Sequence, residues 1–265
     1  MNAHRSSIVF LCVIFLLVGI ASGQVSVASV PQQLRQAEPP SASATVVQLE
    51  ATGDDLHARK YFADALDYYE AANKKQPSAR LVNKIGMMNL LLMRLDSSKK
   101  NFERAIKMDP NYADAYNNLG AVEYQDHRLK PAIKRYQQAI ALNPQFATYH
   151  SNLGTAYMER KEFDKAAAAY ARALQIDPDV FEHRGSAGIS ARFPSPSDRA
   201  RFHYVIAKTY ARAGNTERCL LYLTKAMEFG YKDIDRVYKE DEFASVRKDP
   251  RFAQLMAKKT TLMQP

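Results

Sequence analysis

Residues 113–144 read ADAYNNLGAVEYQDHRLKPAIKRYQQAIALNP, and this stretch decides the fold. It contains two segments, 113–124 and 129–142, in which apolar residues recur at the spacing of an α-helix. A short polar stretch separates them. Pro144 ends the second segment, because proline lacks the amide donor that would continue a helix. The stretch therefore predicts two helices joined by a turn.

The same pattern recurs along the chain at a nearly constant interval. Four prolines close such stretches at spacings of 33, 34 and 34 residues: Pro77, Pro110, Pro144 and Pro178. An aromatic residue stands eight positions before each proline: Tyr69, Phe102, Tyr136 and Tyr170. A glycine recurs in the first segment of each unit: Gly53, Gly86, Gly120 and Gly154. A helix pair this short cannot bury its apolar face alone, so the pattern predicts stacked neighbours.

At these recurring proline, aromatic and glycine positions the chain resembles the tetratricopeptide repeat, a helix–turn–helix unit of about 34 residues. The resemblance implies an all-α fold, a right-handed superhelical α-solenoid of such repeats with a C-terminal helical cap. Four units are expected at 46–78, 79–112, 113–146 and 147–180. An insertion at 181–199, a degenerate fifth unit at 200–231 and capping helices at 232–265 follow. Within these last parts we expect a helix cap at Ser197 or Asp198 and helices over 242–247 and 251–258.

The amino terminus is typical of an export signal. Arg5 precedes the apolar run Ile8–Ile20, which is shorter than the ~20 residues that a membrane-spanning helix needs. Small residues follow, and we expect cleavage after Gly23, which gives residues 1–23 as the signal peptide. The alternative is an uncleaved N-terminal anchor. Residues 24–45 keep no apolar period and are expected to form a flexible linker.

Composition excludes several classes of protein. Of the 265 residues, 46% are hydrophobic and 25% charged, which is typical of a globular chain rather than a disordered one. Two cysteines cannot form a disulfide-rich scaffold, and signal cleavage would leave only Cys219, which is expected to be a buried thiol in a small-residue column. The six histidines form no metal-ligand spacing, and no nucleophile or dinucleotide motif occurs. We therefore expect no catalytic residues, no metal, no cofactor and no enzymatic activity.

The resemblance also implies where a ligand binds, since the first helix of each unit lines the concave groove in this family. Ten residues at the expected groove positions form the candidate peptide-binding site: Arg80, Asn83, Lys84, Met87, Asn117, Asn118, Tyr124, Ser151, Asn152 and Thr155. Asn118 and Asn152 lie 34 residues apart, and an amide can bind both groups of a peptide main chain. The alternative is that these asparagines belong to the repeat pattern and touch no ligand.

The expected function is a non-enzymatic scaffold that binds a protein or peptide in this groove, in the periplasm or outside the cell. No nucleic-acid partner is expected, and membrane contact is expected only through the signal peptide or the anchor. The net charge of +9 leaves a second hypothesis open. In that hypothesis the protein is a structural or assembly module of the envelope that binds polyanions or self-associates through its basic surface.

Overall fold

Every regular element of the described residues, 37–181 and 195–263 of this computed structural model, is helical. The first eight α-helices form four consecutive pairs: α1 (Val46–Ala58) with α2 (Phe62–Lys75), α3 (Ala79–Leu91) with α4 (Leu95–Met108), α5 (Ala113–Gln125) with α6 (Leu129–Leu142), and α7 (Ala147–Glu159) with α8 (Phe163–Ile176). Each of the four expected units contains one pair. The all-α helical-repeat solenoid predicted from the sequence is confirmed.

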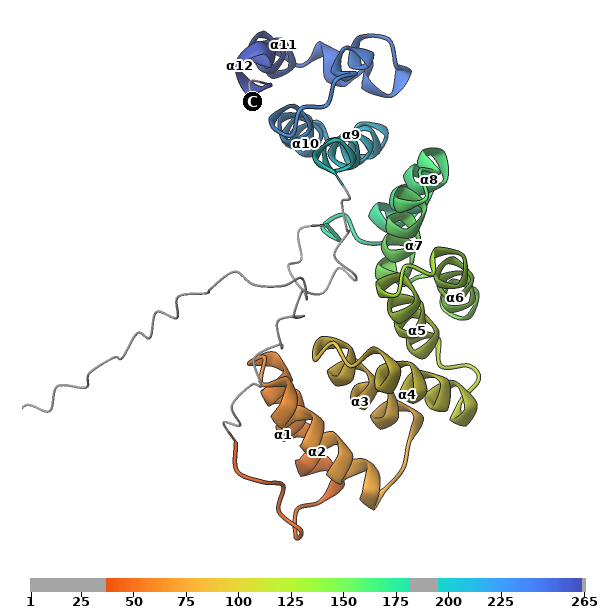
Figure 1. Ribbon diagram of the computed structural model, residues 1–265. Coiled ribbons are helices and arrows are strands. Elements are labelled where there is room, and N and C mark those ends of the chain that lie inside the picture. The colour runs from red at the N-terminus through yellow and green to blue at the C-terminus, as the bar shows by residue number, and fades with distance from the viewer. Residues whose placement is uncertain (1–36, 182–194, 264–265) are drawn as a thin grey trace, which may run out of the picture. The chain divides into compact units, whose positions relative to one another are not determined.

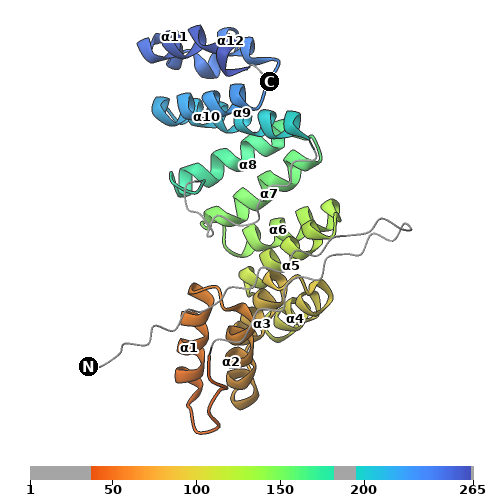
Figure 2. The ribbon, with the colours of Figure 1, turned by 60° about the vertical axis from the view of Figure 1, so that its left-hand side comes forward.

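Each helix packs against the helix that follows it in the chain (Figures 1 and 2). The first helices of neighbouring pairs also touch, because α3 contacts α5 and α5 contacts α7. The core is accordingly a series of neighbouring clusters along the stack of helix pairs. This arrangement places the first helices next to one another, which is the geometry that a shared binding face requires.

In each of the first four pairs, an aromatic ring of the second helix packs against a glycine of the first. The rings of Tyr69, Phe102, Tyr136 and Tyr170 are buried. Each ring lies against the glycine of its own pair, and a Cβ atom built on Gly120 would lie 2.7 Å from Cε1 of Tyr136. The other three glycines show equally short distances. The glycine column is therefore a requirement of close packing between the two helices of a pair.

The turn inside each pair contains a residue with positive φ. These residues are Lys60 (65°), Met93 (59°), His127 (57°) and Lys161 (62°). A fifth pair, α9 (Pro196–Arg212) with α10 (Thr216–Glu228), has Gly214 at the corresponding place with φ of 74°. Glycine adopts this left-handed conformation without the steric cost that a side chain adds. The first four turns therefore adopt it against local preference.

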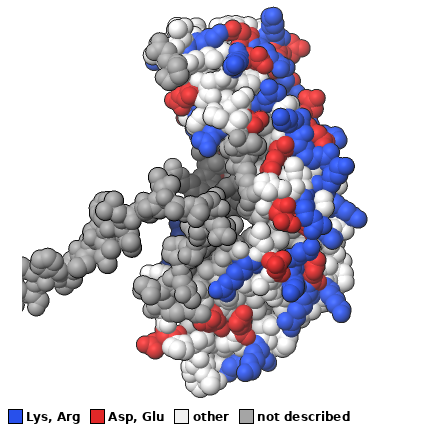
Figure 3. Space-filling model, in the orientation of Figure 1, with Lys and Arg blue, Asp and Glu red and all other residues white. Residues whose placement is uncertain are grey.

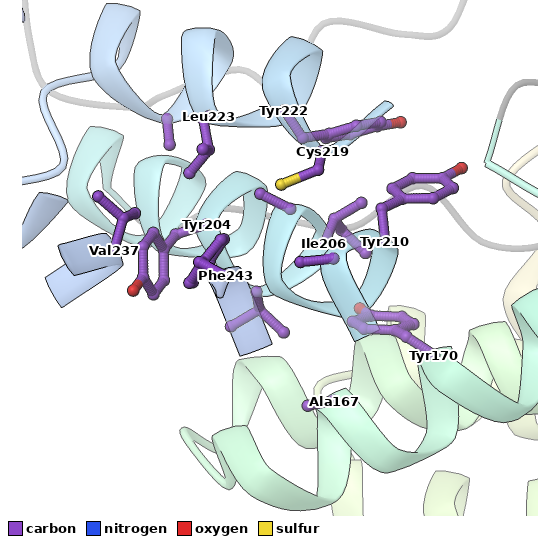
Figure 4. Packing of buried hydrophobic residues seen from close by; sticks show 14 of the residues in the cluster. Ala167, Tyr170, Tyr204, Ile206, Tyr210, Cys219, Tyr222, Leu223, Val237 and Phe243 are labelled. Atoms are coloured by element: carbon purple, nitrogen blue, oxygen red, sulfur yellow. The ribbon is translucent and has the colours of Figure 1, made fainter. Parts of the chain in front are cut away.

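The fifth pair and the C-terminal tail share one core cluster with α7 and α8. Figure 4 shows Cys219 of α10 inside this cluster, near Ile206 of α9 and Leu223. The thiol is free and buried, and burial raises its pKa to about 12. The expectation of a buried structural thiol is confirmed. A thiol with so high a pKa is almost entirely protonated at neutral pH and is a poor nucleophile.

Two expectations for the C-terminal half were wrong in detail. Helix α9 begins at Pro196 and is capped by Ser195, whose side chain accepts a hydrogen bond from the Asp198 amide, so neither Ser197 nor Asp198 is the cap. The helix expected over 242–247 is instead two 3₁₀ turns, Asp241–Phe243 and Val246–Lys248, after another at Ile234–Tyr238. Helices α11 (Pro250–Ala257) and α12 (Lys259–Leu262) follow, with Asp249 as the cap of α11.

The expected linker is also not uniformly flexible. Its last residues lie along α2: the Tyr68 hydroxyl donates to the Glu38 carbonyl at 3.0 Å, and Lys75 Nζ donates to the Ala42 carbonyl at 2.7 Å. Ala44 packs on the first core cluster. Residues 37–44 therefore form part of the folded unit, held by side chains of α2 that the composition of the segment itself could not reveal.

Three expectations fall outside the described residues: the signal peptide at 1–23, the linker from 24 to 36 and most of the insertion, 182–194. Among the helices that the structure describes, none has both the length and the apolar character needed to span a bilayer.

Candidate functional site

A groove of about 480 Å³ runs across the first helices of the four pairs. Residues of α1, α3, α5 and α7 line it, joined by Tyr69 of α2 and by the residues that precede α5 and α7. This volume lies within the range of about 300–1,000 Å³ that small-molecule and side-chain sites occupy. The groove is therefore large enough for several side chains of an extended peptide.

One wall of the groove carries charges that are already paired. Glu50 of α1 is only 9% exposed in its side chain, and it forms ion pairs with Arg80 and Lys84 of α3, the latter at 2.8 Å. Lys84 also contacts Asp54 at 2.5 Å, and the Tyr69 hydroxyl donates to Asp54 at 2.7 Å. Burial raises the pKa of Asp54, but the hydrogen bonds from Lys84 and Tyr69 bring that pKa below its ordinary value. The wall is thus neutralised across the first two pairs.

A chain of asparagine amides, which we call the asparagine chain, runs from the lining of the groove to the buried Asn152. It runs through Asn152, Asn117, Asn118 and Asn83. Asn152 Nδ2 donates to Asn117 Oδ1 at 2.8 Å, and Asn117 Nδ2 donates to Asn118 Oδ1 at 3.2 Å. Asn118 Nδ2 then donates to Asn83 Oδ1 at 3.0 Å, and Asn83 Nδ2 donates to the Tyr112 hydroxyl at 3.4 Å. The amides therefore link three consecutive pairs to one another.

Aromatic side chains also line the groove where α5 and α7 begin. Phe146 is 45% exposed, and its ring lies 4.7 Å from the ring of Tyr149, between centroids. The Tyr149 hydroxyl donates to the Asp114 carboxylate, and burial, followed by this hydrogen bond, raises the pKa of Tyr149 well above its ordinary value. Burial likewise raises the pKa of Tyr112. Both phenols therefore stay neutral and present apolar rings beside hydrogen-bonding hydroxyls.

The structure brings together six of the ten expected site residues, and they all line the groove: Arg80, Asn83, Lys84, Met87, Asn117 and Asn118. The other four were expected at groove positions, and that expectation was wrong, since Tyr124, Ser151, Asn152 and Thr155 are buried and do not line the groove. Among the six that line it, Asn83 and Asn117 are also buried. Tyr124 packs in the cluster around Tyr136, and Asn152, only 1% exposed, is occupied by the asparagine chain. Their side chains fill the space between pairs, where a ligand cannot reach them without rearrangement.

Sequence reasoning missed several residues that line the groove, chiefly Tyr112, Phe146, Tyr149 and His57. Tyr112 and Phe146 each precede a first helix and stand 34 residues apart, and this column was the signal that could have found them. Burial, and then the charge of Lys84, lowers the pKa of His57 despite the opposing effect of Asp54, so its ring is neutral at neutral pH.

The arrangement favours recognition by shape and hydrogen bonding. Asp54, Arg80 and Lys84 are paired within the protein, which lowers their attraction for a charged ligand, and Asp114 accepts a hydrogen bond from Tyr149. Met87 and Phe146 offer apolar surface. Over the described residues, no group of three His, Cys, Asp or Glu side chains lies close enough to hold a metal ion. The site is thus suited to an uncharged segment with an apolar anchor.

Comparison with known proteins supports the repeat assignment. Residues 94–127 match a family model described as TPR repeat, and residues 127–180 match one described as tetratricopeptide repeat. No curated protein matches the chain. Among solved structures, the chain is similar to TTC0263, a thermophilic TPR protein of Thermus thermophilus, with 21% identity over 77% of this chain and 99% of that one, at a TM-score of 0.51.

A second solved structure, pilF of Pseudomonas aeruginosa, shows 16% identity over 80% of this chain and 97% of that one, with a TM-score of 0.53. At these identities the likeness concerns the fold alone. The two family models and the two structures agree on one architecture for the helix pairs.

Proposed function

Since the chain is a tetratricopeptide repeat protein, and such proteins bind protein or peptide partners, we propose that its groove binds an extended peptide segment of a partner protein. The observation that carries this proposal is the composition of the groove, which combines charges paired within the protein, aromatic rings and the apolar Met87. Such a surface suits an uncharged segment that inserts one apolar side chain.

We further propose that the protein performs this role as a scaffold without catalysis, in the periplasm or outside the cell. The export signal expected over residues 1–23 supports the location. Sequencing the amino terminus of the protein recovered from its native cells tests this part. A first residue of Gln24 supports export with cleavage, and recovery of the intact terminus in the cytosol contradicts it.

A matched pair of methionine substitutions tests the groove. Random peptides of about twelve residues are selected on the full chain, and their Kd values are measured by fluorescence anisotropy. Met87→Lys places an ammonium group in the groove, where its desolvation opposes binding, and we expect affinity to fall at least about tenfold. Met93→Lys is the control, since Met93 lies in the turn of the same pair, where two other pairs have lysine.

We expect Met93→Lys to leave peptide affinity within about twofold of the unmodified chain. Thermal unfolding of both variants establishes that they are folded. If both variants lose peptide affinity equally, or if the peptides bind both variants as tightly as they bind the unmodified chain, binding in the groove is contradicted.

A further inference from the structure

The second helices of the second and third pairs carry a row of lysine and arginine residues on their exposed side. On α4, Lys100, Arg104 and Lys107 recur at intervals of four and three residues, and on α6 Lys130 and Lys134 are four apart. These spacings place each set on one side of its helix. We call these five residues the basic face. In Figure 3 blue atoms, with red atoms between them, lie along the side of the molecule on which α4 and α6 run in Figure 1.

No residue of the basic face forms an ion pair with any described residue. The nearby acids are few: α4 contains Asp96 and Glu103, and α6 contains neither Asp nor Glu. Like charges four residues apart on a helix destabilise it by a few tenths of a kcal/mol. On α4, Asp96 and Glu103 each stand four residues before a lysine of the row, which is a favourable spacing, but α6 offers no acid to its lysines. The five cations, unpaired among the described residues, are therefore available to an external anion.

One position of the row is shared by these two helices and by neither neighbour. Lys100 and Lys134 occupy the same position of consecutive repeats, whereas α2 has Asp67 there and α8 has Ala168. Helices α4 and α6 both pack against α5 and lie in consecutive pairs. The shared lysine position is therefore a local feature of α4 and α6, whereas the positions of Arg104 and Lys107 also hold cations in a flanking pair, at Arg172 and Lys74.

Apolar side chains stand at the end of both rows. Met108, the last residue of α4, is 41% exposed, and Leu142, the last residue of α6, is 40% exposed. They are 34 residues apart, and each lies eight residues after the shared lysine position, on the same side of its helix. Cations flanked by exposed apolar side chains are characteristic of surfaces that bind the interface of a membrane.

We propose that the basic face binds the anionic headgroups of a lipid bilayer, with Met108 and Leu142 inserting between the headgroups. Lysines near an anionic bilayer each contribute severalfold to binding, because the surface potential attracts them within about 10 Å. A soluble polyanion would use the cations equally well, but it gives no role to the two apolar residues. The lipid surface accounts for both observations.

This docking surface is independent of the peptide groove. The groove is lined mainly by first helices, and α4 and α6 contribute no residue to it. The protein can therefore hold a partner segment in the groove while the basic face rests on a membrane. Failure of one proposal leaves the other standing, since the variants that test them lie on different helices.

Binding of the full chain to lipid vesicles tests the proposal. Phosphatidylcholine vesicles are compared with vesicles that contain about one-third phosphatidylglycerol, at roughly 0.1 M salt. The neutral vesicles measure the contribution of the apolar N-terminal run, which all variants share. We expect at least about tenfold stronger partitioning to the anionic vesicles, and Lys100→Glu with Lys134→Glu should remove this preference.

Lys232→Glu with Lys239→Glu is the matched control. These exposed lysines lie in the tail, form no ion pair among the described residues, and change the net charge by the same amount. The control pair should keep the preference for anionic vesicles within about twofold. Equal loss in the two pairs, or no preference in the unmodified chain, overturns the proposal.

Substituting the apolar residues separates lipid from soluble polyanion. Met108→Ser with Leu142→Ser should weaken binding to anionic vesicles about tenfold and leave binding to polyphosphate unchanged. If these substitutions leave vesicle binding intact and polyphosphate binds as tightly as the vesicles do, the face is a polyanion site and the lipid proposal is overturned.

Discussion

Asn117 shows how a residue predicted to bind a ligand serves the protein itself. Its Oδ1 accepts from Asn152 at 2.8 Å and its Nδ2 donates to Asn118 at 3.2 Å, so both ends of the amide are occupied. The 34-residue spacing of Asn118 and Asn152 predicted groove positions for both, but only Asn118 lines the groove. The spacing could not show that the amides pair with each other, because this depends on how closely neighbouring first helices approach.

Replacing Asn117 therefore affects stability. Asn117→Ala removes the acceptor of Asn152 and the donor to Asn118, and leaving buried polar groups unpaired costs about 1–3 kcal/mol. We expect the free energy of unfolding in urea to fall by about 2 kcal/mol. Asn101→Ala is the control, since Asn101 donates to Ser97 on the exposed side of α4, and it should change stability by less than about 0.5 kcal/mol. A similar loss in both variants would contradict a structural role for the asparagine chain.

At the scale of the helix pair, the sequence predicted the structure best. The recurring glycine and aromatic positions predicted stacked helix pairs, and the structure places each ring against its glycine. The parts that the sequence did not predict are those held by other segments. Residues 37–44 contact Tyr68 and Lys75 of α2, and the 3₁₀ turn Asp241–Phe243 packs on α9.

Adding a methyl group in the glycine column tests this packing. A Cβ on Gly120 would lie 2.7 Å from Cε1 of the buried Tyr136 ring. Overpacking costs about 1–3 kcal/mol, and the helix preference of alanine returns up to about 1 kcal/mol. Gly120→Ala should therefore lower the free energy of unfolding by about 1–2 kcal/mol. In a Tyr136→Leu background the same substitution should be neutral or stabilising, and an unchanged cost there would show that the ring is not the cause.

At the scale of the whole molecule, contacts run mainly between neighbouring elements. Clusters of buried residues follow the stack, and the last of them joins α7–α10 to the tail. In such repeat proteins stability is close to a sum of units and their interfaces. A destabilising substitution at one end of the stack is therefore expected to weaken mainly the units near that end.

Phe243 provides a test of this locality. It is fully buried in the tail, with its ring 5.7 Å from the ring of Tyr204 on α9. Phe243→Ala should cost about 3–5 kcal/mol. Hydrogen exchange should then show faster exchange in α9, α10 and the tail, with α1–α4 unchanged. Tyr238→Ala, at an exposed position of the same tail, should leave exchange nearly as it was, and uniform loss of protection along the chain would contradict the nearest-neighbour description.

The turns with positive φ influence the order in which the helix pairs fold. Lys60, Met93, His127 and Lys161 hold the left-handed conformation against a preference worth about 1 kcal/mol each, and among the described pairs the fifth relieves this conflict with Gly214. Each of the first four pairs is therefore locally frustrated when it stands alone. During synthesis each nascent hairpin should stay loosely closed until the following one emerges and packs on it, so that order passes along the chain in the direction of translation.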